Sequence, residues 1–190
     1  DQQLALASPF LDEHGVVFQP GTNEDMAATA IWGTQKVGLH PGARVQGVFG
    51  IWYGKAPGVD RCGDVFRHAN MSGTAPLGGV LAVAGDDYLA KSSSLPSHSE
   101  LAFADWEIPV LSPSDLQEVL DYGLIGIALS RHAGTWAALI AISETMNSSG
   151  IVTVGGGRPS IVAPPALPHP RPAPALHRFP PPRPRPAPAR

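Results

Sequence analysis

Apolar residues are grouped along the first 150 positions in runs that have the length of strands. The two most regular runs, GVFGIWYG at 47–54 and GVLAVAG at 79–85, have the composition of strands that are buried on both faces. Shorter apolar runs at 16–18, 108–111 and 135–142 predict three further strands. The sequence therefore predicts five short strands.

Segments with helical periodicity separate these runs. Residues 2–13 predict a short helix, and a second helix is expected from the capping residues Thr22 and Asn23 to Val37, because acidic residues follow in its first turn. Strands that alternate with helices imply right-handed crossovers and a mainly parallel sheet covered on both faces. The predicted fold class is a three-layer α/β/α arrangement. The remaining helices are expected over 60–71, from Ser97 or Ser99 to Trp106, and from 112–115 to about His132.

Charge and proline content divide the chain near residue 158. Residues 1–150 hold 7 Lys+Arg against 16 Asp+Glu, a net charge of −9, whereas residues 151–190 hold 6 Arg and no acidic residue. From residue 163 onward, Pro, Ala and Arg make up 23 of 28 residues, a composition that cannot form an apolar core. We therefore predict an α/β domain over 1–157 and a disordered tail over 158–190.

Composition also excludes several classes of protein. The single cysteine, Cys62, rules out an internal disulfide framework and a cysteine-ligated zinc or iron–sulfur site within the chain. The neighbouring Arg61 is able to lower the pKa of this thiol, but an incidental thiol is the simpler interpretation because no partner residue is adjacent. No apolar stretch has the length of a membrane span and no secretory signal opens the chain, so we expect a cytoplasmic protein without membrane contact. Arginines spread through a proline-rich tail beside an acidic domain also argue against nucleic-acid binding.

Candidate ligand-binding residues follow the apolar runs. The sequence contains no G-x-G-x-x-G, P-loop or G-x-S-x-G motif, which removes support for ordinary dinucleotide, phosphate-loop and hydrolase functions. In a parallel sheet, ligands bind beyond the carboxyl ends of the strands, so the informative residues lie at 22–25, 55–64 and 86–94. Acidic side chains there also have structural roles, in favouring a helix dipole or forming a turn. Both interpretations stay open at this point.

Four segments carry a family resemblance across nearly all of residues 1–155. The segments are FQPGTNEDMAATAIWGTQ (18–35), GARVQGVFGIWYGKAPGVDRCGDVFRHAN (42–70), GGVLAVAGDDYLAKSSSLPSHSE (78–100) and IPVLSPSDLQEVLDYGL (108–124). In this order they resemble the N-terminal region of the large, fused indolepyruvate:ferredoxin oxidoreductases, members of the thiamine-diphosphate-dependent 2-oxoacid:acceptor oxidoreductase family. This resemblance implies the pyrimidine-side domain of the thiamine-diphosphate-binding fold.

The resemblance implies a catalytic role for Glu24. By its position in NEDMAATA, Glu24 resembles the carboxylate that family members hydrogen-bond to N1′ of the cofactor's aminopyrimidine. A buried carboxylate there shares a proton with N1′ and so promotes the tautomer in which the 4′-imino group acts as a base. The cofactor itself carries the bond-making and accepts electrons on decarboxylation, while the protein supplies placement and electrostatics. The implied reaction converts an aryl 2-oxoacid such as indolepyruvate to an acyl-CoA, with ferredoxin as electron acceptor.

Further residues resemble loops that border the family's cofactor and substrate pocket. If Lys55 faces that pocket, its ammonium orients a 2-oxo carboxylate. The resemblance places Mg²⁺ with the diphosphate on a partner domain, and iron–sulfur clusters and CoA only in the complete enzyme. The implied partners are therefore the missing diphosphate-binding and acceptor domains, ferredoxin and the 2-oxoacid, in a parent enzyme that is a homo-oligomer. The residues that resemble these cofactor-binding loops are Lys55, Asp60, Asp64, Asp86, Asp87, Lys91, Ser92 and Ser93.

The chain departs from the family in three respects. Relative to the family, we expect a strand and a glycine-rich turn to be missing before residue 1, and the large remainder of the enzyme to be missing after residue 155. This fragment would carry half of a cofactor site, and should bind thiamine diphosphate weakly. The third departure is the Pro/Arg/Ala tail, for which two hypotheses stand: an out-of-frame continuation, or an extended segment that contacts other proteins.

Two functional hypotheses follow from the sequence. In the first, the chain is part of a thiamine-diphosphate-dependent 2-oxoacid:ferredoxin oxidoreductase and is inactive in isolation. In the second, it is a catalytically incompetent α/β domain with a disordered tail, which acts through binding alone or has no function.

Overall fold

The structure is a computed structural model of the 190-residue chain, and it describes residues 2–39, 41–91, 93–156 and 160–164. Its centre is a four-stranded sheet with the order β1-β2-β4-β3. The strands are β1 (Phe49–Lys55), β2 (Gly79–Asp86), β3 (Val110–Leu111) and β4 (Trp136–Ile142). Every pairing is parallel: Phe49 aligns with Gly79, Val80 with Trp136, and Val110 with Ala138.

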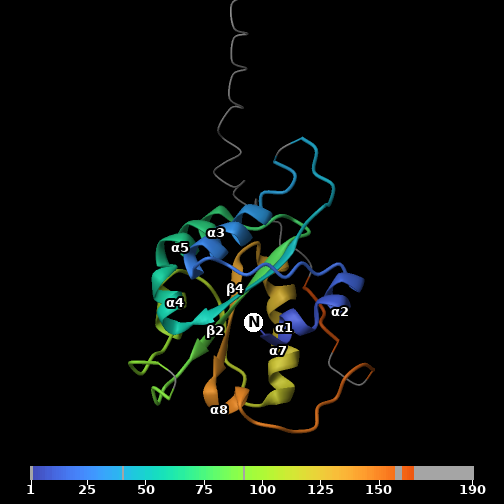
Figure 1. The fold of residues 1–190 in the computed structure, drawn as a ribbon. Coiled ribbons are helices and arrows are strands. Elements are labelled where there is room, and N and C mark those ends of the chain that lie inside the picture. Colours follow the sequence, from blue (N-terminus) through green and yellow to red (C-terminus); the bar gives the residue numbers. More distant parts are fainter. Residues whose placement is uncertain (1, 40, 92, 157–159, 165–190) are drawn as a thin grey trace, which may run out of the picture.

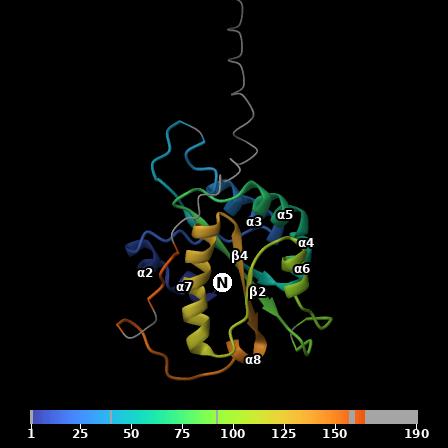
Figure 2. The ribbon, with the colours of Figure 1, turned by 180° about the vertical axis from the view of Figure 1, so that it is seen from behind.

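Helices cover both faces of this sheet (Figures 1 and 2). The helices α3, α4, α5 and α6 lie on one face, and the long helix α7 packs against β2 and β4 on the other. The predicted three-layer α/β arrangement with a parallel sheet is therefore confirmed. The helices are α1 (Gln2–Leu6), α2 (Ser8–Glu13), α3 (Glu24–Thr34), α4 (Ala56–Arg61), α5 (Gly63–Ser72), α6 (Glu100–Asp105), α7 (Leu116–Ala133) and α8 (Ser143–Met146).

An aromatic cluster forms the larger core, on the face that carries four helices. Phe66 of α5 is fully buried at its centre. Its ring centroid lies 4.9 Å from that of Trp52 on β1 and 5.4 Å from that of Trp136 on β4. The ring centroids of Phe103 on α6 and of Trp106, which directly follows α6, lie 5.8 and 5.6 Å from that of Phe66. Burial of five large rings fixes α5 and α6 on the sheet.

The opposite face has a smaller aliphatic core beneath α7. Leu81, Ala137 and Leu139 of the sheet are buried there against partly buried side chains of α7. The helix approaches closely at Gly126, where an added Cβ would lie 2.6 Å from Cδ1 of Leu81. Asp115 caps α7 by accepting a hydrogen bond from the Glu118 amide at 2.8 Å, and Gly134 ends the helix in a left-handed conformation.

Most of the predicted elements are present with small changes in their bounds. The expected helix over 60–71 is two helices, α4 and α5, and the strand expected at 108–111 contains only two residues. The strand predicted at 16–18 is wrong. The Val16 amide donates to the Leu11 carbonyl at 2.8 Å and Gly15 has a φ of 65°, so this run completes the end of α2 instead of joining the sheet.

The predicted tail over 158–190 falls almost wholly outside the described residues. Only 160–164 are described within it, and they form neither helix nor strand. The prediction of disorder for the tail and the boundary at residue 157 therefore stay predictions.

Candidate functional site

The parallel arrangement brings the carboxyl ends of the strands to one edge of the sheet. There β1 ends at Lys55, β2 at Asp86 and β4 at Ile142. The helices α4 and α8 begin directly after β1 and β4, at the same edge (Figure 1). Ligands of parallel α/β proteins bind in this position, so we take this edge as the candidate site.

Glu24 is the first residue of α3, which Asn23 caps by accepting a hydrogen bond from the Met26 amide at 2.8 Å. The Glu24 carbonyl accepts a hydrogen bond from Nε1 of Trp52 at 3.0 Å, which ties the start of α3 to β1. Its partly buried side chain lies against α4, where a Cβ added to Gly58 would lie 2.6 Å from Cγ of Glu24. A larger residue at position 58 would displace the Glu24 side chain from this position.

An ion pair beside Glu24 joins the same two helices. Nε of Arg61 lies 3.0 Å from Oδ1 of Asp25, so the start of α3 is held against the end of α4. The carboxylate of Glu24 itself makes no hydrogen bond or ion pair with another side chain in the described part of the chain. Of Glu24 and Asp25, Glu24 is therefore the acid whose carboxylate has no polar side-chain partner among the described residues.

The Cys62 thiol is fully buried just after α4. Burial raises its pKa to about 12, and the neighbouring carboxylates of Asp25 and Glu24 add to this effect more than Arg61 opposes it. Arg61 therefore does not give this thiol a lowered pKa overall, because burial and the two carboxylates outweigh it. An unreactive core thiol agrees with the structure.

Asp86, the last residue of β2, is 1% exposed and binds the start of α6. Its Oδ2 accepts a hydrogen bond from the Ser99 amide at 2.7 Å, and its Oδ1 accepts one from the Ser99 hydroxyl at 2.6 Å. Burial raises the pKa of Asp86, and the two bonds from Ser99 partly oppose that rise. Both carboxylate oxygens of Asp86 thus hold the start of α6. Because the Ser99 hydroxyl donates to Asp86, it does not cap α6 as expected.

Asp87 closes the loop that joins β2 to α6. Its carbonyl accepts hydrogen bonds from the amides of Ala90 and Ser97, and its Oδ1 accepts one from the Lys91 amide at 3.0 Å. Asp87 is only 3% exposed. It fixes the two sides of this loop to each other at the carboxyl edge of the sheet.

Tyr88 ties the same loop to α6. Its hydroxyl donates to Oε1 of Glu100 at 2.6 Å, and its ring lies 4.8 Å from the His98 ring. Burial raises the pKa of the Tyr88 phenol, and the acceptor carboxylate of Glu100 raises it further. The phenol is therefore held as a neutral donor.

The remaining predicted residues are more dispersed. Lys55, Asp60 and Asp64 are exposed at the end of β1, on α4 and on α5, and the Asp64 carboxylate lies 3.4 Å from Nδ1 of His68 on its own helix. The hydroxyl of Ser93 is buried without a hydrogen-bond partner among the described residues, and Ser92 lies outside them. The predicted residues of the β2–α6 loop therefore lie close to one another, whereas Glu24 lies against α4.

Glu144 is a member of this edge that the sequence analysis missed. It lies on α8, directly after β4, and its Oε1 is 3.1 Å from Nζ of Lys91. The hydrogen bond from Lys91 lowers the pKa of Glu144. Its position just after the predicted strand at 135–142 is the signal in the sequence that points to it.

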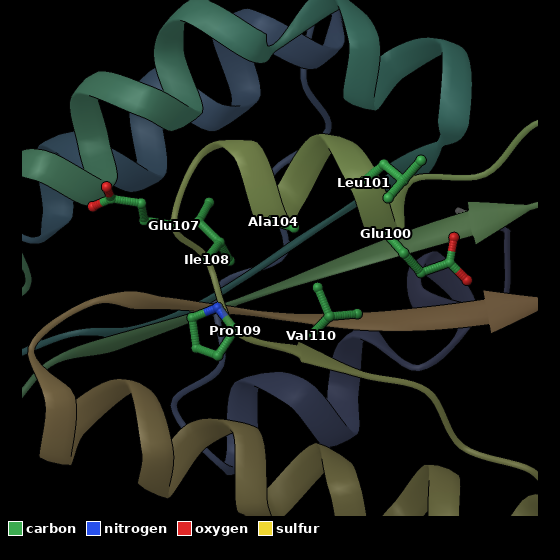
Figure 3. A pocket seen from close by; sticks show the side chains of 7 residues that line it. All are labelled: Glu100, Leu101, Ala104, Glu107, Ile108, Pro109 and Val110. Carbon is green, nitrogen blue, oxygen red and sulfur yellow. The ribbon is translucent and has the colours of Figure 1, made fainter.

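Two surface hollows flank the edge. One, of about 610 Å³, runs between α6 and β3; it is lined by Leu101, Ala104, Ile108, Pro109 and Val110, with Glu100 and Glu107 at its margins (Figure 3), and it contains no predicted site residue. The second, of about 530 Å³, lies between the start of α7 and α8 and includes Glu144. The second hollow is the one at the carboxyl end of a central strand.

Comparisons with known proteins add no assignment to this geometry: no family model matches the chain, and a search of curated proteins finds no significant match. Within the described ranges, no group of three or more His, Cys, Asp or Glu side chains is placed to hold a metal ion. None of the described helices combines the length and the apolar character needed to cross a bilayer.

Proposed function

We propose that this chain is the pyrimidine-side domain of a thiamine-diphosphate-dependent 2-oxoacid:ferredoxin oxidoreductase that acts on an aryl 2-oxoacid such as indolepyruvate. The position of Glu24 carries the proposal. This carboxylate begins α3, lies against the helix that follows β1, and has no other polar partner among the described side chains. The sequence resemblance supplies the identity of the reaction.

The residues around Glu24 fit the group that the proposal requires. A carboxylate that is to bind N1′ of an aminopyrimidine must be near the surface, anchored through its backbone and free of competing cations. Trp52 anchors the Glu24 carbonyl, and Arg61 is engaged by Asp25. Gly58, which has no Cβ, lets the Glu24 side chain pack against α4.

In the proposed mechanism, this chain positions the cofactor and holds one proton. When bound, thiamine diphosphate supplies the carbon nucleophile and the electron sink for decarboxylation. An Oε atom of Glu24 would share a proton with N1′, and enclosure between two domains would raise its proton affinity by desolvation. Asp86 and Asp87 would act indirectly, by holding the β2–α6 loop beside the cofactor.

Calorimetric titration tests the half-site character of the domain. The 190-residue chain should bind thiamine diphosphate with Mg²⁺ only weakly, because the proposal assigns the diphosphate and the metal to a partner domain. The enzyme expressed from the same locus with its flanking coding sequence should bind tightly and should reduce ferredoxin with indolepyruvate and CoA. Tight binding by the 190-residue chain alone would contradict the assignment of the diphosphate site to another domain.

A further inference from the structure

One ion pair bridges the candidate site. Lys91, in the loop after β2, and Glu144, on the helix after β4, place Nζ and Oε1 3.1 Å apart. Their side chains are 54% and 44% exposed. The pair therefore spans the carboxyl ends of the two central strands and remains accessible from solvent.

The backbone of Lys91 is held more firmly than its side chain. Its amide donates to Oδ1 of the buried Asp87, and the preceding residue, Ala90, has a left-handed φ of 53°. The ammonium, in contrast, is held by one exposed ion pair, an interaction that contributes little net free energy. Loss of the ion pair with Glu144 would leave the bond from the Lys91 amide to Asp87 in place.

The hollow beside Glu144 has room for the rest of such a ligand. Its volume of about 530 Å³ falls within the range of small-molecule sites. Leu116 and Ile142 give it an apolar lining, and Ile151 lies exposed at its margin. The hydroxyls of Ser114 and Ser148 also line it, and they donate to Glu118 and to the Thr145 carbonyl. A planar aryl or indolyl group has the size and polarity to lie against this lining.

We propose that Lys91 binds the carboxylate of a 2-oxoacid. In the free protein Glu144 forms an ion pair with the Lys91 ammonium, and the substrate carboxylate displaces Glu144. The choice of a 2-oxoacid rests on the proposed function, whereas the carboxylate exchange rests on the geometry of the pair and the hollow. Glu144 is then an internal competitor with the same chemical group as the substrate. Lys91 determines specificity for an acid over the corresponding neutral ketone.

The other charged groups near the pair are consistent with this exchange. Asp87 is buried and accepts the Lys91 amide, so it stays in place when Glu144 leaves. Asp115 also lines the hollow, but its Oδ1 is engaged as the cap of α7 through the Glu118 amide. Through its pair with Glu144, Lys91 lies beside the hollow, where it is placed to meet an entering carboxylate.

Titration of the 190-residue chain with phenylpyruvate tests the binding step by NMR. Amide shifts should appear at Lys91, at Glu144 and around the hollow. Glu144→Gln should lower the apparent Kd at least threefold, because the internal competitor is removed, and Lys91→Met should raise it at least tenfold. The matched control is Lys36→Met, which removes a lysine whose Nζ donates to the Ser72 carbonyl. This control should bind as wild type does.

Two ligand controls sharpen the result. Benzyl methyl ketone, which keeps the ring and the ketone but lacks the carboxylate, should leave the Lys91 and Glu144 resonances unchanged. Tighter binding of inorganic pyrophosphate than of phenylpyruvate at Lys91 would assign the ammonium to a diphosphate and overturn the proposal. It is also overturned if Lys91→Met binds phenylpyruvate as wild type does, or if Glu144→Gln fails to bind more tightly.

Kinetics of the enzyme with its flanking domains separate this inference from the proposed function. Glu144→Gln should lower KM for the 2-oxoacid with little change in kcat, and Lys91→Met should raise KM. Normal turnover with KM unchanged in both variants would overturn the role of Lys91 and leave the proposed function intact. An enzyme without 2-oxoacid turnover would refute the proposed function, while the NMR titration would still decide whether Lys91 exchanges carboxylates.

Discussion

Substitution of Ser99 by Ala should destabilise the domain substantially, although it removes only one hydroxyl group. Ser99 is 2% exposed and donates two hydrogen bonds to Asp86, which is 1% exposed. The substitution removes the bond from Oγ to Oδ1 and leaves a buried carboxylate oxygen without its donor. A hydrogen bond to a charged group contributes about 1.5–3 kcal/mol, so we expect a loss of about 2 kcal/mol in the free energy of unfolding.

A double-mutant cycle with Asp86→Ala isolates the interaction. Asp86→Ala leaves the Ser99 amide and hydroxyl buried without an acceptor, and should cost about 3 kcal/mol. Because each single variant already breaks the same contact, the double variant should be less destabilised than the sum of the two by at least about 1 kcal/mol. Ser94→Ala, at an exposed serine, is the matched control and should stay within about 0.5 kcal/mol of wild type.

Urea denaturation followed by tryptophan fluorescence measures these differences, since Trp52, Trp106 and Trp136 all belong to the core that unfolding disrupts. The expected loss for Ser99→Ala corresponds to a fall in Tm of about 4–8 °C for a domain of this size. Strictly additive effects of the two substitutions, or a Ser99→Ala variant as stable as Ser94→Ala, would refute the assignment of Asp86 to the fixing of α6.

Three further predictions follow from the buried groups. Burial raises the pKa of Asp86 in the folded chain above its ordinary value of 3.8, so Asp86 contributes most to stability below pH 3.8 and less as the pH rises through the raised pKa. The urea midpoint of wild type, relative to that of Asp86→Asn, should therefore fall over this pH interval. A rise in the relative midpoint would contradict a raised pKa. Cys62, buried with a pKa of about 12, should not react with Ellman's reagent at pH 8 until guanidinium unfolds the chain, and rapid labelling of the native chain would refute its burial. Phe66→Ala should lower the free energy of unfolding by about 3–5 kcal/mol, and Phe66→Leu by clearly less, because Phe66 is the centre of the aromatic cluster. The same denaturation assay measures both losses. Equal losses would argue that ring packing is not the source of the stabilisation.

Local signals were sufficient to predict most of the fold. The apolar runs that became β1, β2 and β4 have the length of strands, and caps such as Asn23 and Asp115 mark the starts of α3 and α7. The expected burial on both faces is wrong for β1, which is an edge strand and leaves Ile51 and Tyr53 exposed. The run at 16–18 has strand composition, but strand formation requires a paired neighbour, and the Val16 amide already closes α2. Composition alone does not contain that information.

The candidate site was less predictable because its contacts join distant residues. The bond between Asp86 and Ser99 spans 13 positions, and the pair of Lys91 and Glu144 spans 53. A sequence pattern identifies Asp86 as an acid after a strand, but it does not distinguish a carboxylate that binds a ligand from one that fixes a helix. Glu24 differs because its helix-start position is visible in the sequence, whereas the packing of its side chain against Gly58 became visible only in the structure.

The most direct test of the proposed function is the effect of Glu24→Gln on turnover in the enzyme expressed with its flanking coding sequence. The amide cannot share a proton with N1′ as the carboxylate does, so indolepyruvate-dependent ferredoxin reduction should fall by about 100-fold or more, with an unchanged circular dichroism spectrum. Glu13→Gln, which makes the same change at an exposed glutamate of α2, is the matched control and should keep the activity. Turnover of Glu24→Gln at the level of the Glu13→Gln control would contradict the catalytic role of Glu24.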